Sequence, residues 1–249
     1  MSNISIQDLD KTYPGTPPVK ALDNISLEVA PGELVALLGP SGCGKSTLLN
    51  LIAGFEAPTQ GQLRVHGQPV AAPGPDRGVV FQEAALFPWL TVWENVIFGP
   101  RVQGMARSEY EDRAHEMLKI VGLVDFKNHL PVQLSGGMRQ RVGLARILTL
   151  GSRVLLMDEP FGALDAQTRL TMQELLLSVW QQLKPTIIFV THDIDEAIFL
   201  ASTVYVMSAR PGRIQTRIEV PLARPRTVAD TASETFSSLK LEILNLIRH

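Results

Sequence analysis

The chain has 249 residues, enough for one large domain or for a domain with a subdomain. Hydrophobic residues make up 45% and charged residues 19%, and the net charge of −2 lacks the basic excess that is typical of nucleic-acid-binding proteins. The single cysteine excludes an internal disulfide framework, and no apolar run of about 18 residues is present that could span a bilayer. The start at Met1–Ile4 has no basic region followed by an apolar stretch, so we expect no secretory or transit segment.

Two kinds of strand are predicted. Apolar and polar residues alternate at 4–9, 25–29 and 62–66, as in half-exposed antiparallel strands. Elsewhere, short apolar, β-branched runs alternate with helical patterns, which predicts a parallel sheet covered by helices. These buried strands are expected at 34–38, 78–81, 154–157, 186–190 and 203–207.

The strand at 34–38 runs into a glycine-rich turn and then into a predicted helix. Glycines let the backbone wind tightly, so that several N–H groups point at one anion, and the helix adds its N-terminal donors. Lys45 supplies a charge for the outer phosphates of a nucleoside triphosphate, and the Ser46 hydroxyl suits Mg²⁺. The predicted nucleotide-binding residues here are Gly39, Pro40, Ser41, Gly42, Cys43, Gly44, Lys45, Ser46 and Thr47.

From about residue 84 to 150 the strand signal disappears. Helical patterns at 92–98, 108–121 and 137–148 predict a helical insertion. Another helix is expected at 165–183, and Asp193 with Glu196 predicts a capping box that opens a further helix. Apolar residues at helical spacing from residue 232 predict an amphipathic tail helix packed on the body, and the segments 71–76 and 221–226 are expected to be surface loops.

Ser135, Gly136 and Gly137 precede the helix at 137–148 and predict a second anion-binding helix start. This element could face the same nucleotide or a nucleotide on another subunit, and spacing alone does not choose between these possibilities.

Polar residues at the carboxyl ends of three predicted strands complete the candidate site, because ligands of open α/β sheets bind at this edge. Asp158 is the expected Mg²⁺ ligand, and Glu159 is placed to orient or deprotonate the attacking water. His192 is predicted to contact the γ-phosphate. Gln82 offers an amide oxygen to Mg²⁺ or to the water.

The order of the phosphate loop, Gln82, Leu134-Ser-Gly-Gly, Val154-Leu-Leu-Met-Asp-Glu and His192 resembles the ATP-binding subunit of ABC transporters over nearly the whole chain. The resemblance implies a P-loop NTPase core with a mostly parallel sheet, an N-terminal antiparallel β subdomain and an inserted helical subdomain. One ABC ATPase domain would cover 1–249, with its core at about 1–83 and 151–220, the helical subdomain at about 84–150 and a C-terminal helix at about 232–248.

The resemblance also implies a mechanism, in which a head-to-tail dimer, of this chain or with a like ATPase subunit, encloses two ATP molecules with Mg²⁺. The segment 134–138 of one subunit would cap the ATP of the other, and Tyr13 would stack on adenine. The loop 162–165 would couple the two sites, and the helical insertion would receive the membrane permease subunits. Two positions depart from the family pattern: Met138 replaces the usual Gln, and Gly162 replaces a common Ser.

Segments 74–82, 86–89, 191–197 and 208–213 are similar to the nitrate/sulfonate/taurine importer group. We therefore expect a peripheral subunit on the cytoplasmic face of the inner membrane, linked through permeases to a periplasmic solute-binding protein, with no nucleic-acid partner. The alternative is a soluble ABC-type ATPase acting in DNA repair or translation, and a third interpretation is a P-loop kinase or GTPase. A guanine-reading Asn-Lys-x-Asp motif is absent from the sequence, as are long coiled-coil insertions.

Cys43 supports a further hypothesis. Its position near a helix start and Lys45 favours a reactive thiolate, so a maleimide would abolish activity and MgATP would protect. The alternative is a small buried side chain that fills space.

Overall fold

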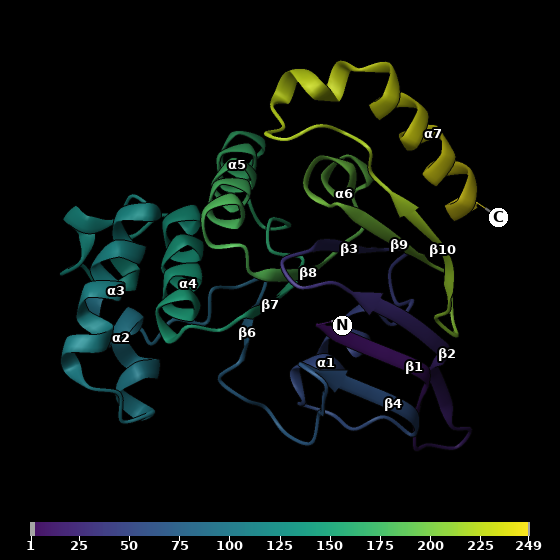
Figure 1. Cartoon of the computed structure of the whole chain (residues 1–249), viewed down its shortest axis with the longest axis horizontal. Coiled ribbons are helices and arrows are strands. Elements are labelled where there is room, and N and C mark those ends of the chain that lie inside the picture. The colour runs from purple at the N-terminus through teal and green to yellow at the C-terminus, as the bar shows by residue number, and fades with distance from the viewer. Residues whose placement is uncertain (1–2, 249) are drawn as a thin grey trace. The chain divides into compact units, whose positions relative to one another are not determined.

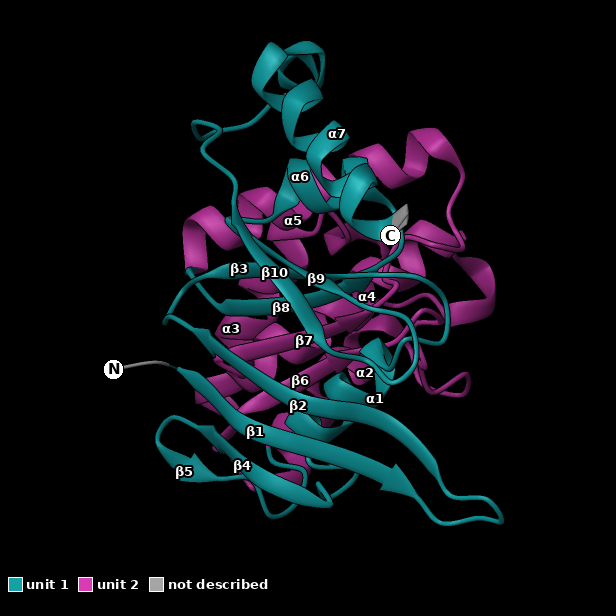
Figure 2. Cartoon of the chain, turned by 90° about the vertical axis from the view of Figure 1, so that its right-hand side faces the viewer, with its two compact units in different colours: residues 1–74, 184–249 teal, residues 75–183 magenta. Residues whose placement is uncertain are grey.

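The computed structural model describes residues 3–248. Met1, Ser2 and His249 lie outside the described residues, so the expectation about a secretory or transit segment falls partly outside them. The chain divides into two compact units (Figure 2), of which unit 1 comprises residues 1–74 and 184–249 and unit 2 comprises residues 75–183. No helix among the described residues is long and apolar enough to cross a membrane.

An antiparallel sheet opens unit 1, with its strands in the order β2-β1-β4-β5. Its strands are β1 (Ile4–Tyr13), β2 (Val19–Val29), β4 (Gln60–Val65) and β5 (Gln68–Pro69). Ile4 and Ile6 on one face of β1 are buried while Gln7 is exposed, which gives the alternation expected of a sheet with one covered face. All three predicted antiparallel strands are present, and β1 and β2 extend beyond the predicted ranges.

The second sheet of unit 1 has the strand order β10-β9-β3-β8. Its strands are β3 (Leu34–Leu38), β8 (Thr186–Thr191), β9 (Thr203–Met207) and β10 (Ile214–Glu219). β3 pairs in parallel with both β8 and β9, and β10 pairs antiparallel with β9. Every residue of β3, β8 and β9 is buried, which explains why these strands read as apolar runs without alternation.

Among its described residues, unit 1 contains the α-helices α1 (Lys45–Ala53), α6 (Ile194–Leu200) and α7 (Glu234–Arg248), with a short 3₁₀ helix at Val228–Ala232. α7 lies alongside α6 (Figure 1) and buries Phe236, Leu239 and Ile243, which share one helical face, while Leu241 on the other face is exposed. Asp193 caps α6, since its carboxylate accepts a hydrogen bond from Glu196 N at 3.1 Å.

Unit 2 contains the parallel strand pair β6 (Arg77–Val80) and β7 (Val154–Asp158) together with the helices between and after them. The helices are α2 (Val92–Val102), α3 (Arg107–Ile120), α4 (Gly136–Leu150) and α5 (Ala166–Leu183), with short 3₁₀ helices at Val124–Phe126 and Pro131–Gln133. Both α2 and α3 pack on α4. A capping box of Thr91 and Glu94 opens α2, which accounts for the sharp helix start after the proline- and aromatic-rich segment 86–89.

The segment 221–226 is not the simple surface loop that the sequence predicts. The Arg226 side chain is buried, at 5% exposure, and Nη1 donates to the carbonyls of Ile198, Phe199 and Ala201 at the C-terminal end of α6. Burial lowers the pKa of Arg226 to about 10, so the group stays charged at neutral pH and neutralises the negative end of the helix. The composition of segment 221–226 does not indicate this role of Arg226, because prolines and arginines usually occur in exposed loops.

Candidate nucleotide-binding and catalytic site

The phosphate loop connects β3 to α1 and depends on glycine backbone geometry. Gly42 and Gly44 have φ of 74° and 97°, in the left-handed region that favours glycine. A Cβ on Gly44 would lie 2.6 Å from Leu22 Cδ2 and 3.0 Å from the Ala21 carbonyl oxygen, so β2 leaves room only for glycine there. The loop is therefore wound tightly against the antiparallel sheet of the same unit.

Lys45 holds a positive charge inside this loop. Its ammonium donates to the carbonyls of Gly39, at 2.7 Å, and Pro40, at 3.0 Å, and the side chain is buried. Ser46 follows in the first turn of α1 and is exposed, at the N-terminal end of the helix. A buried ammonium surrounded by turn amides suits an anion with several oxygens.

Cys43 fits the space-filling alternative better than the reactive one. Its side chain is 1% exposed, and Sγ lies 3.0 Å from the position that a Cβ on Gly39 would take. Access of a bulky maleimide to this thiol requires the loop to open.

Tyr13 ends β1 and is fixed by charged neighbours that the sequence did not single out. Its hydroxyl donates to Glu56, at 2.7 Å to Oε2, and Lys11 Nζ pairs with the same carboxylate at 3.0 Å and lies 4.9 Å from the centre of the Tyr13 ring. Burial raises the pKa of Tyr13, a hydrogen bond with Thr47 opposes the rise, and Glu56 adds to it. Burial alone would raise the pKa of Glu56, but hydrogen bonds with Tyr13 and Lys11 hold it below its usual value. The ring is thus held in one orientation beside the first turn of α1.

His192 emerges next to the phosphate loop. Leu38, the last residue of β3, pairs with Thr191, the last residue of β8, so Gly39 and His192 leave the sheet at neighbouring positions of the same edge. His192 is exposed. The strand register therefore brings His192 to the phosphate loop, and its contact with the γ-phosphate stays a prediction.

In unit 2, Gln82 and Glu159 converge on one point. β6 and β7 pair in parallel with Val80 opposite Met157, so both residues follow the same sheet edge. Gln82 Nε2 lies 3.3 Å and Glu159 Oε2 lies 3.6 Å from where a Cβ on Gly162 would stand. Gly162 N also donates to the Glu159 carbonyl at 3.1 Å. Gly162, where the family commonly has Ser, therefore leaves open the space on which the Gln82 and Glu159 side chains converge.

Glu159 has φ of 43°, a backbone conformation that L-residues other than Asn and Asp rarely adopt. Asp158 precedes it as the last residue of β7 and is partly buried. Strain of this kind concentrates at functional sites, because surrounding structure must hold it in place.

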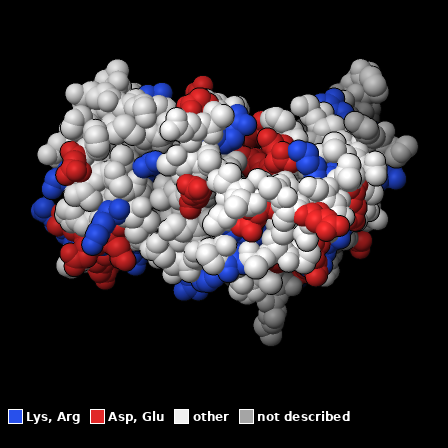
Figure 3. All heavy atoms as spheres, turned by 90° about the horizontal axis from the view of Figure 1, so that it is seen from above, with Lys and Arg blue, Asp and Glu red and all other residues white. Residues whose placement is uncertain are grey.

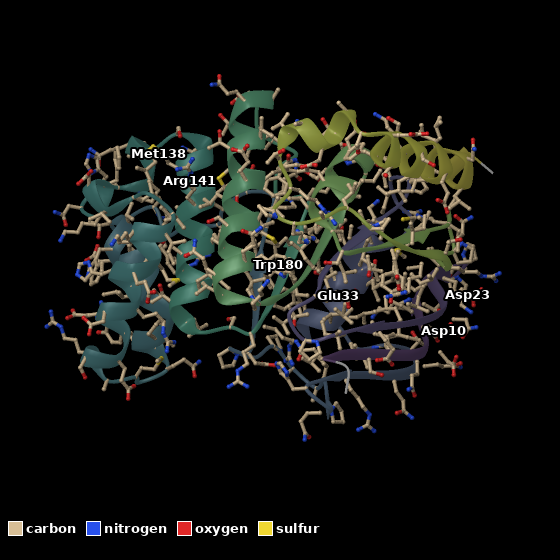
Figure 4. The ribbon with its side chains drawn as sticks, turned by 45° about the horizontal axis from the view of Figure 1, so that its top comes forward. Asp10, Asp23, Glu33, Met138, Arg141 and Trp180 are labelled. Atoms are coloured by element: carbon tan, nitrogen blue, oxygen red, sulfur yellow. The ribbon has the colours of Figure 1, made fainter. Side chains whose placement is uncertain are left out.

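Ser135 caps α4, since its hydroxyl accepts a hydrogen bond from Met138 N at 3.2 Å. Gly137 is packed so closely that a Cβ would lie 2.6 Å from Thr168 Cγ2 on α5, whereas Ser135 and Gly136 are exposed. Met138, labelled in Figure 4 near the start of α4, is partly buried. The helix start thus presents its backbone donors to the surface with the serine already ordered.

The sequence-predicted residues fall into two groups. Tyr13, the phosphate loop and His192 belong to unit 1, whereas Gln82, Asp158, Glu159 and Ser135 to Gly137 belong to unit 2. Each group is assembled as described, and a joint site of the two groups stays a prediction. Glu56 and Lys11 are not among the sequence-predicted residues. Lys11 lies two residues before Tyr13, but Glu56 is 43 residues away from it, so no local pattern indicates this pair.

Comparison with known proteins agrees with this geometry. Residues 22–162 match the family model described as ABC transporter. The chain is 46% identical to the Taurine import ATP-binding protein TauB of Ruegeria pomeroyi, over 99% of this chain and 94% of the relative, and 47% identical to the Nitrate import ATP-binding protein NrtD of a Synechocystis species, over 99% and 95%. A solved structure, the dimeric post-hydrolysis state of the ATP-binding cassette MJ0796 bound to ADP and Pi, superposes with a TM-score of 0.75 at 33% identity, covering 88% of this chain and all of that chain. The predicted resemblance and α/β fold class are thereby confirmed, and this chain belongs to the ABC transporter family as one of its ATP-hydrolysing, ATP-binding proteins.

Proposed function

We propose that this protein is the ATP-hydrolysing subunit of an ABC importer that moves a taurine-, sulfonate- or nitrate-type solute through separate permease subunits. The observation that carries the catalytic part is the convergence of Gln82 and Glu159 on Gly162 beside the end of β7. The importer part rests on similarity over 99% of the chain to proteins named for taurine and nitrate import.

Hydrolysis proceeds by in-line attack of water on the γ-phosphate. Lys45 and the loop amides hold the β- and γ-phosphates, and Tyr13 stacks on the adenine ring. Glu159 takes or orients the proton of the attacking water, and His192 holds the γ-phosphate. We expect Glu159→Gln to keep ATP binding and to accumulate a dimer with ATP, measured by size-exclusion chromatography with light scattering. Wild-type turnover in this variant would remove Glu159 from its role.

Mg²⁺ fits the donors that the chain offers. The Ser46 hydroxyl, the Gln82 amide oxygen and the Asp158 carboxylate are hard oxygen ligands of the kind that Mg²⁺ prefers, together with phosphate oxygens. When bound, the ion would neutralise charge on the phosphates, and these three residues would hold it. No group of three or more His, Cys, Asp or Glu among residues 3–248 forms a metal cluster, which agrees with a site that relies on ATP for most of its ligands.

The exposed start of α4 supports closure of the site by a second subunit. Ser135 and Gly136 present donors at the positive end of a 15-residue helix, where an anion binds well. The related cassette of known structure is a dimer bound to ADP and Pi. We therefore assign residues 135–137 to the γ-phosphate of the ATP held by the partner subunit.

A groove of about 580 Å³ in unit 2 is the docking site that we assign to the permease. It is lined by Gln82, Pro88, Val132 and Arg139, among others. Val132 is 83% exposed and the nearby Trp89 is 73% exposed, which is unusual for large apolar side chains without a partner. Because Gln82 lines the same groove, a helix seated there would contact a residue of the catalytic group. This assignment implies a peripheral position at the cytoplasmic face of the inner membrane and an indirect link to a periplasmic solute-binding protein.

The genomic neighbourhood is searched for permease genes, and co-expression with a permease found there tests the proposal. Val132→Asp should abolish co-purification and permease-stimulated ATP hydrolysis, because it replaces an exposed apolar side chain of the groove by a charged one. Val102→Asp is the matched control, since Val102 is 68% exposed on α2 and does not line the groove. Full complex formation by the Val132→Asp variant would refute the docking site. A genomic neighbourhood without permease genes would refute the importer function.

Both charge signs are interspersed over the face drawn in Figure 3, where Lys and Arg lie among Asp and Glu. The groove with its exposed apolar residue Val132, and not a field of one charge, is thus the surface feature on which the partner assignment rests.

A further inference from the structure

The turn between β9 and β10, residues 208–213, lies against the outer side of the phosphate loop. Gly212 approaches the loop so closely that a Cβ on it would lie 2.0 Å from the Cys43 carbonyl oxygen. Arg210 reaches the neighbouring peptide, since its Nε donates to the Gly42 carbonyl at 2.8 Å. Two successive carbonyls of the loop therefore face this turn, which is 168 residues away from Gly42 in the sequence.

The turn is itself fixed to β2. Gly212 N donates to the Ala21 carbonyl and Asp23 N donates to the Gly212 carbonyl, both at 2.9 Å. The Arg213 guanidinium pairs with Asp23, which is labelled on β2 in Figure 4. Arg210 thus extends from a rigidly attached segment, which makes its hydrogen bond a restraint on the loop.

Peptide geometry converts this restraint into an orientation of the loop amides. In a trans peptide the C=O and the next N–H point in opposite directions. Because the Gly42 carbonyl is held outward by Arg210, the Cys43 N–H points inward, where it meets the Pro40 carbonyl at 3.3 Å. The close approach of Gly212 orients the following peptide, so the Gly44 N–H also points inward. The Cys43 N–H is bonded to the Pro40 carbonyl within the turn, so the restraint fixes the turn itself as well as the direction of the Gly44 N–H, which a bound phosphate can use.

We propose that Arg210 is a positioning residue for the phosphate loop, acting through the Gly42 carbonyl to keep the loop amides aimed at the nucleotide phosphates. This inference rests on the proposed function only in that the loop binds ATP. The side chain reaches the loop from its outer side, and its role is to order the loop before ATP arrives.

The single cysteine of the chain provides a readout that does not depend on activity. The Cys43 side chain is 1% exposed and belongs to the loop whose Gly42 and Cys43 carbonyls face Arg210 and Gly212. We expect Arg210→Ala to raise the rate of Cys43 labelling by a small disulfide reagent in the nucleotide-free protein by about three- to tenfold, the range that the loss of one typical intramolecular hydrogen bond implies for local opening. Arg210→Lys, which can still donate to the carbonyl, should restore part of the protection.

Nucleotide binding gives the second readout. Arg210→Ala should weaken MgATP and MgADP binding by about three- to tenfold, with the KM of ATP hydrolysis rising more than kcat falls. Arg217→Ala is the matched control, an exposed arginine on the same hairpin whose guanidinium bonds Glu219. It should change neither labelling nor binding, and all variants should melt within a few degrees of wild type.

Wild-type labelling rates and affinities in Arg210→Ala would overturn the proposal. If Gly212→Ala also left both unchanged, the close approach of the turn would be irrelevant to the loop. Faster Cys43 labelling in Arg210→Ala, together with no ATP binding by the wild-type protein, would instead overturn the nucleotide function and leave the restraint on the loop intact. The two failures are therefore distinguishable.

Discussion

The positive φ of Glu159 allows a prediction with an unusual sign. At 43°, the backbone lies where a side chain costs an L-residue about 1–2 kcal/mol. Replacing Ala by Gly normally destabilises a protein by about 0.5–1 kcal/mol, because glycine loses more backbone freedom on folding. At position 159 the relief of strain exceeds that entropy loss. We therefore expect Glu159→Gly to be more stable than Glu159→Ala by about 0.5–1 kcal/mol.

Both variants remove the carboxylate, so their difference isolates the backbone effect. For a chain of this size, 1 kcal/mol corresponds to about 2–4 °C in melting temperature, which differential scanning calorimetry resolves. Ala163→Gly is the matched control, because Ala163 is exposed in the same loop and has no positive φ. Ala163→Gly should lower the melting temperature relative to the wild type, whereas Glu159→Gly should melt at a higher temperature than Glu159→Ala.

Activity provides the link to function. All Glu159 variants should lose most ATP hydrolysis, because each removes the carboxylate that the proposed mechanism places at the attacking water. An Ala variant that melts at or above the Gly variant would show that no strain is stored at Glu159, and the functional argument from its backbone would fall.

Three further predictions follow from the site and the fold. Lys45→Ala should weaken ATP binding at least tenfold, about 1.4 kcal/mol, because a buried cation of the phosphate loop is lost; isothermal titration calorimetry measures this, and unaltered affinity would refute the loop assignment. Ser135→Ala should cost about 1 kcal/mol of stability through loss of the α4 cap and should slow hydrolysis in the complex; calorimetry and phosphate release measure the two effects, and a stability loss alone would leave Ser135 as a cap only. Arg226→Met should destabilise the protein by about 2–4 kcal/mol, since three carbonyls at the end of α6 lose their donor; urea unfolding tests this, and a change below 0.5 kcal/mol, about the size of a surface substitution, would contradict the structural role.

Local sequence was sufficient for the elements whose signal lies within a few residues. β3, the glycine turn and α1 are contiguous, so strand, turn and helix start each carry their own pattern, and the strand appears at the predicted residues 34–38. β9 likewise matches its predicted range because both of its faces are buried and its apolar run is unbroken.

Strand length was predicted poorly where the pairing is irregular. β1 continues to Tyr13, four residues beyond the predicted end, and its pairing with β2 shifts register between Ile6 and Leu9 and again beyond Leu9. Asp8 within this region has φ of 47°. Each irregularity interrupts the alternation of apolar and polar residues, so a period of two residues no longer describes the strand.

The positions of the candidate residues could be predicted from the sequence because each follows a strand or opens a helix, and parallel strands bring their carboxyl ends to one edge. Their chemical roles stay predictions. Tertiary structure alone decided that Glu56 and Lys11 hold Tyr13, that Arg226 neutralises the end of α6 and that Arg210 reaches the phosphate loop. Each of these contacts joins segments that are far apart in the chain, and each is made by a charged residue of a type that is usually exposed. Their partners are mainly backbone carbonyls, which every residue carries, so no sequence pattern distinguishes the carbonyl that will be bound.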